Sequence, residues 1–176
     1  MNPHTEHFVL PARLLHWTMA LMIIAMLFIG AAMVSTVSTA HSTLVAWHRP
    51  IGSAILLLVL LRIVVRLRHP PPALPSDIPA WQRHAARLSH WLLYALMIAM
   101  PLIGWAMLAA GGYPVQIFST LRLPPIAPHD LHLYTVLHRL HTYLAYLFLL
   151  TVLMHLAAAM FHGLIRKDGV FRSMAS

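Results

Sequence analysis

The stretch that decides the fold is His141–His155, HTYLAYLFLLTVLMH, an apolar run with a histidine at each end. Fourteen positions separate the two rings, about 40° short of four full turns at 3.6 residues per turn. Both rings therefore leave one face of one helix, ~21 Å apart along its axis and within the ~30 Å hydrocarbon thickness of a bilayer. Polar rings at such depth are costly unless a partner holds them, so the stretch predicts a functional membrane helix.

Composition places the whole chain in the membrane class. Of its 176 residues, 60% are hydrophobic and 9% are charged, whereas soluble domains contain about 25% charged residues. The continuous apolar runs do not alternate as barrel strands do, so helices are favoured. We predict an all-α membrane protein, one domain over residues 1–176 and a four-transmembrane-helix bundle, with helices at about 14–34, 44–65, 88–110 and 134–161.

Charge and cysteine usage exclude several functions. The net charge of +8 comes from 12 Lys+Arg against 4 Asp+Glu. These basic residues flank hydrophobic spans instead of forming a patch on a soluble face, so the expected partner is the lipid bilayer and not nucleic acid. The chain has no cysteine, which excludes Cys-ligated iron–sulfur clusters, thiolate haem and covalently attached c-type haem.

The basic residues are divided unequally between the two ends of the spans, and this predicts the orientation. Nine lie on one side: Arg13, Arg62, Arg66, Arg68, Arg83, Arg87, Arg166, Lys167 and Arg172. Three lie on the other: Arg49, Arg122 and Arg139. The excess of positive charge marks the cytoplasmic side, so both termini are expected there.

The first apolar stretch is expected to be retained as a helix. From Trp17 to Val34 it is longer than the 7–15 residues typical of the apolar region of a signal peptide. Cleavage after Ala40 would also remove His16, which stands at the head of this span.

Four histidines form the candidate site. His16 begins the first apolar span and His48 the second. Because consecutive helices run antiparallel, His16 should lie level with His155. By the same argument His48 should lie level with His141, although His138, three residues earlier, is the alternative ligand. Four histidines at two depths predict two bis-histidine haems, which shuttle electrons and leave no open position for substrate at the iron.

Further polar residues at the span ends suggest contacts to these groups. Arg49 and Arg139 each adjoin a candidate outer ligand and could pair with haem propionates; ordinary snorkelling to the interface is the alternative. Four residues at the cytoplasmic end could line a quinone pocket or contact lipid head groups: Arg87, His90, His162 and Arg166. A surface zinc site is conceivable on the outer loops, with the ligands His41, His129, Asp130 and His132.

Short motifs occur in a specific order along nearly the whole chain. They are R-L-x-H-W at Arg13 to Trp17, H-R-P-I-G at His48 to Gly52, A-R-L-S-H at Ala86 to His90, P-L-I-G at Pro101 to Gly104, G-x-P-V-x-x-F at Gly112 to Phe118, and His141 with His155 followed by H-G-L-I-R-K-D. In this order the chain resembles the bacterial cytochrome b561 family, di-haem b-type proteins of the inner membrane. The resemblance implies two haem b with axial ligands at His16, His48, His141 and His155. It also implies quinone-linked electron transfer, with His90 and His162 near the quinone.

Two functions from different classes remain. The first is an electron carrier between an outer-side donor and the quinone pool. Arg49, Arg122 and Arg139 would favour an anionic donor, and superoxide is one conceivable example. The second is a haem-bearing membrane anchor for a separate dehydrogenase or hydrogenase. The sequence leaves the donor, the direction of electron flow and a homodimer open.

Overall fold

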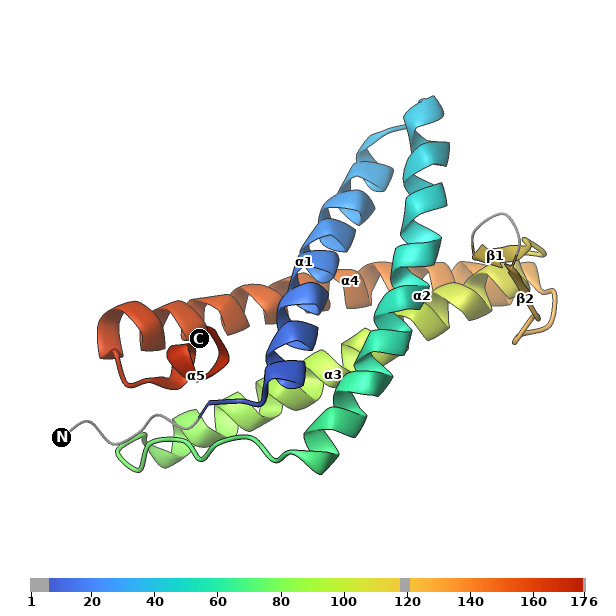
Figure 1. The fold of residues 1–176 in the computed structure, drawn as a ribbon. Helices are drawn as coiled ribbons and strands as arrows, with labels where there is room; N and C mark the ends of the chain where they lie inside the picture. Colours follow the sequence, from blue (N-terminus) through green and yellow to red (C-terminus); the bar gives the residue numbers. More distant parts are fainter. Residues whose placement is uncertain (1–6, 118–120, 176) are drawn as a thin grey trace.

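The computed structural model describes residues 7–117 and 121–175. This part of the chain contains four long helices and a two-stranded hairpin (Figure 1). The helices are α1 (Leu10–Ser35), α2 (Thr39–Arg68), α3 (Ala80–Ala110) and α4 (Leu131–Met160). A π-helical segment, η1 (Phe161–Arg166), continues α4 and is followed by the short helix α5 (Val170–Ala175). All four long helices are apolar enough and long enough to cross a membrane, which confirms the predicted fold class.

The helices extend beyond the apolar windows that predicted them. α2 begins at Thr39, where the Ser38 hydroxyl accepts a hydrogen bond from the backbone N–H of Ala40 at 3.3 Å. α4 begins after Asp130, whose carboxylate accepts the N–H of Leu133 at 3.0 Å. That hydrogen bond lowers the pKa of Asp130 from its ordinary value. Caps of this kind satisfy the free N–H groups of a first turn, so polar residues outside the hydrocarbon continue the helix.

A small β-hairpin between α3 and α4 was not part of the all-α expectation. β1 (Val115–Ile117) pairs antiparallel with β2 (Leu121–Leu123), with Val115 opposite Leu123. The indole N–H of Trp105 donates to the carbonyl of Pro124 at 2.9 Å, which attaches the hairpin to α3. Three-residue strands are too short to show alternation in sequence. Phe118, the last residue of the G-x-P-V-x-x-F motif, lies outside the described residues.

The four helices pack as two pairs. α1 lies against α2 and α3 against α4, while α2 also contacts α3. In Figure 1 the α1–α2 pair leans across the α3–α4 pair. All four helices contribute to the buried core, which consists of Met19, Ile23, Ile55, Val59, Leu96, Met97 and Phe148. Phe148 is seven residues from both His141 and His155, so this core separates the two levels of histidines.

The first and last described segments of the chain lie against each other. The backbone N–H of Phe8 donates to the carbonyl of Ser173 at 3.0 Å. The indole N–H of Trp17 donates to the carbonyl of Met174 at 3.1 Å. Segment η1 is followed by Lys167, which has a left-handed φ of 54°, and this turn directs α5 back toward the start of α1. The first and last described segments therefore lie together at the His16 end of the bundle.

Candidate functional site

Two pairs of histidine rings lie at the two expected levels. The ring centroids of His16 and His155 are 6.2 Å apart, with 67° between the ring planes. Those of His48 and His141 are also 6.2 Å apart, at 64°. All four side chains are half-buried. α4 supplies one ring to each pair, as the fourteen-residue spacing predicts.

The spacing within each pair fits an iron atom held between the rings. An imidazole nitrogen lies ~2.0–2.1 Å from a metal that it ligates, and the ring centroid is about 1 Å further back. Two rings on opposite sides of one iron therefore have centroids about 6 Å apart. The Nδ1 atoms of His48 and His141 are also buried, and within the described residues neither has a hydrogen-bond partner. Buried polar ring atoms without partners are uncommon, and they mark these two rings as functional and not merely structural.

The donor set is suited to a macrocycle and not to a bare ion. The described ranges contain no group of three or more His, Cys, Asp or Glu side chains that could hold a metal ion. Two axial imidazoles are sufficient only where a porphyrin supplies the remaining ligands. The absence of such a group from the described ranges also argues against the surface zinc site that was considered on the outer loops. His41 there bonds instead to the carbonyl of Met33 at 3.1 Å.

The structure brings His141, and not His138, to His48. The side chain of His138 is exposed, and its ring lies 6.0 Å from that of Tyr134. Gly104 also lies against the His141 ring, because a side-chain carbon added at Gly104 would lie 3.5 Å from the His141 Cε1 atom. Residues three apart on a helix differ in direction by about 60°, which turns His138 away from the partner helix.

The His16–His155 pair, named the inner pair because the predicted orientation puts it toward the cytoplasm, has a third histidine beside it. The ring of His90, on α3, lies 5.7 Å from that of His155 and is half-buried. His90 was expected in a quinone pocket, and the structure places it directly against the inner pair. By distance alone, His90 and His16 are therefore both candidates to stand opposite His155.

Arg62, on α2, also contacts the inner pair and was not among the predicted site residues. It bonds to Nδ1 of His16 at 3.3 Å. Two features of the sequence could have identified Arg62. It lies inside an apolar run, LLLVLLRIVV, and it stands level with His16 if the first two helices are antiparallel. Charged residues inside membrane spans are rare and mark functional sites.

The other residues predicted for the quinone pocket lie in different surroundings. His162 Nδ1 is 2.6 Å from the carboxylate of Asp168. Arg166 contacts the same carboxylate at 3.1 Å and that of Asp77 at 2.6 Å. The side chain of Arg87 is exposed. Asp168 was not among the predicted site residues. The signal that could have found it is the composition, because each of the 4 acidic residues has several basic residues with which it can pair.

A family model described as prokaryotic cytochrome b561 matches residues 7–176. The chain belongs to the prokaryotic cytochrome b561 family. It is thus a multi-pass bacterial membrane protein of electron transport, of a family that binds b-type haem. This confirms the resemblance found in the motifs.

Three relatives are similar to this cytochrome b561. Cytochrome b561 homolog 1 of Escherichia coli is 28% identical over 127 residues, 72% of each chain. The probable superoxide oxidase CybB of Yersinia pestis is 33% identical over 128 residues, again 72% of each chain. Cytochrome b561 homolog 2 of Escherichia coli is 29% identical over 162 residues, 90% of this chain and 86% of the relative.

The two arginines considered as propionate partners in this cytochrome b561 differ in burial. Arg49 follows His48 and is half-buried, and its Nε atom is buried without a hydrogen-bond partner in the described part of the chain. Arg139 is exposed. Of the two arginines, Arg49 is the one with a buried donor atom to which an anionic group such as a propionate could bond.

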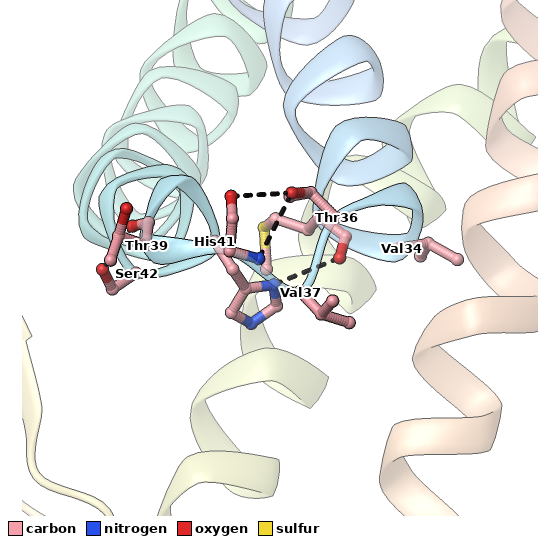
Figure 2. Close-up of a pocket in the computed structure, with 8 residues that line it drawn as sticks. Val34, Thr36, Val37, Thr39, His41 and Ser42 are labelled. Carbon is pink, nitrogen blue, oxygen red and sulfur yellow. Dashed lines mark hydrogen bonds between the residues drawn. The ribbon is translucent and has the colours of Figure 1, made fainter.

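An open hollow lies at the turn between α1 and α2 (Figure 2). The figure shows His41 pointing toward the backbone of α1, and the hydroxyls of Thr36 and Ser38 lie 3.1 Å apart. The residues lining this hollow are Met33, Val34, Thr36, Val37, Ser38, Thr39, His41 and Ser42. None of the paired rings is among them, so the hollow is separate from the histidine site.

Proposed function

We propose that this cytochrome b561 is a di-haem electron carrier, with His16 and His155 as the inner axial ligands and His48 and His141 as the outer ones. The observation that supports this is the repeated 6.2 Å spacing of the two ring pairs. Each bound haem b would supply a carrier for one electron at a time. Two rings would hold each haem, one on each face, and the core around Phe148 separates the two levels.

The inner end offers groups for a quinone. Both termini would lie on the cytoplasmic side of the inner membrane, where basic residues predominate. His90 adjoins the inner pair. His162 can donate a hydrogen bond or a proton to a quinone oxygen, and its 2.6 Å contact with Asp168 fixes the orientation of its ring. A reduced quinone needs protons as well as electrons, and these side chains are the proton donors that the proposal requires.

Difference spectroscopy tests the cofactor part of the proposal. The purified protein should show a reduced-minus-oxidised spectrum of b-type haem, and haem extraction should give two haems for each chain. A chain that binds no haem after expression with ample haem supply would contradict the proposal. Stable co-purification with a dehydrogenase would instead favour the role of membrane anchor.

The outer end is suited to an anionic donor, and we propose superoxide. Arg49, Arg122 and Arg139 are the basic residues expected on this side, and a relative is named a probable superoxide oxidase. Superoxide would give up one electron and leave as dioxygen, while the outer site gains that electron.

A pulse of superoxide should therefore reduce the oxidised protein, followed as haem absorbance. The rate should fall several-fold in the Arg49→Gln, Arg139→Gln double variant, because electrostatic attraction speeds association. Superoxide dismutase should abolish the reduction. The same rate in the double variant and the parent protein would contradict steering by these arginines, and no reduction at all would exclude superoxide as donor.

A further inference from the structure

Arg62 is a membrane arginine held by partners from two other helices. Its guanidinium donates to the carbonyl of Ala12 on α1 at 3.2 Å and to the hydroxyl of Tyr94 on α3 at 3.1 Å. Its third contact is the 3.3 Å bond to His16 Nδ1. The residue is half-buried. Burying a charge in a span is expensive, and three polar anchors on one side chain indicate that its position matters.

The contact with His16 is the one that changes when that ring ligates a metal. A neutral imidazole has one donor and one acceptor nitrogen, and an arginine only donates. If the other ring nitrogen of His16 binds iron, Nδ1 must retain the proton and can no longer accept a hydrogen bond. The bonds to Ala12 and Tyr94 are unaffected, so the guanidinium stays beside the inner pair.

We propose that Arg62 is a fixed positive charge that raises the reduction potential of the inner haem site. This rests on the proposed pairing of His16 with His155. Reduction adds one negative charge between these rings, and a nearby cation stabilises that charge strongly where the dielectric constant is low. Guanidinium remains protonated throughout the accessible pH range, so its effect is permanent. Arg62 is therefore a positioning residue whose charge helps the inner site to accept electrons.

Redox titration of charge variants tests this role. In Arg62→Gln the equilibrium constant for reducing the inner site should fall by about tenfold, which is ~59 mV for a one-electron couple. Arg62→Lys retains the charge and should keep most of the potential. Arg66→Gln is the matched control, because Arg66 is one turn further along α2, with its guanidinium 5.7 Å from the centre of the Tyr94 ring. It removes an equal charge and should shift the inner potential much less.

The redox signals of the two haems are distinguished by repeating the titrations in a His48→Ala background, in which only the inner haem should remain. An unchanged inner potential in Arg62→Gln, or an equal shift in Arg66→Gln, would overturn the inference. If Arg62→Gln does not retain haem, Tyr94→Phe replaces it. That variant keeps the charge but removes one anchor, and it should lower the inner potential in the same direction; no shift there would count against the inference. Failure of the parent protein to bind haem would instead refute the proposed function.

Discussion

His16→Ala and His155→Ala should each remove the same haem and leave one b-type haem for each chain. His48→Ala and His141→Ala should each remove the other haem. Losing one ring leaves a single axial bond and a cavity where the ring stood, so haem affinity should fall by at least about tenfold. Haem extraction and difference spectra of the four purified variants measure this. A double variant within one pair should lose no more haem than either single variant.

Two histidines of the same chain serve as controls. His138→Ala and His90→Ala should keep both haems, because neither is a proposed ligand. The His90 control is the sharper of the two, since its ring is 5.7 Å from His155, comparable with the 6.2 Å between His16 and His155. If His90→Ala loses the inner haem and His16→Ala keeps it, His90 is the ligand and the proposed inner pair is wrong.

His162→Ala should slow reoxidation of the reduced protein by a soluble quinone by about 10²-fold, the usual contribution of a general acid. His90→Ala should also slow it. Asp168→Asn should have a smaller effect in the same direction, because the His162 ring remains but its 2.6 Å carboxylate partner becomes a neutral amide. Both haems should stay bound and reducible in all three variants. Stopped-flow absorbance of the haem band measures the rate.

His84→Ala is the matched control for this experiment. His84 is on α3 like His90, but its side chain is exposed and its ring bonds only to the local carbonyl of Ala80, at 2.8 Å. Its replacement should leave reoxidation unchanged. Reoxidation at the parent rate in both His90→Ala and His162→Ala would move the quinone site elsewhere, most directly to the outer pair.

The histidine pairs could be predicted from sequence because they depend on regular geometry. The spacing of His141 and His155 sets two levels on one helix, and antiparallel connection of the spans assigns His16 and His48 to those levels. No knowledge of side-chain packing is needed for either step. The choice of His141 over His138 as a ligand follows in the same way, and the structure places the His141 ring 6.2 Å from that of His48.

Other parts depend on contacts that periodicity does not determine. Arg62 bonds to three groups that are 32, 46 and 50 residues away in sequence. Asp168 meets His162 only because η1 and the left-handed residue Lys167 turn the chain at the end of α4. The hairpin of β1 and β2 has strands of 3 residues each, below the length at which alternation can be recognised. The starts of α2 and α4 were also misplaced, because the side-chain caps of Ser38 and Asp130 and not hydropathy set them.

The arrangement in which α4 supplies a ring to both pairs has a consequence for biosynthesis. α1 and α2 are made early and contain one ring for each proposed haem, but the opposite rings are at residues 141 and 155. A nascent chain therefore has no complete ligand set until its last span has left the ribosome. The outer set is completed first and the inner set fourteen residues later. With the proposed ligands, haem loading would be a late step of synthesis, and a chain truncated before α4 could form neither pair.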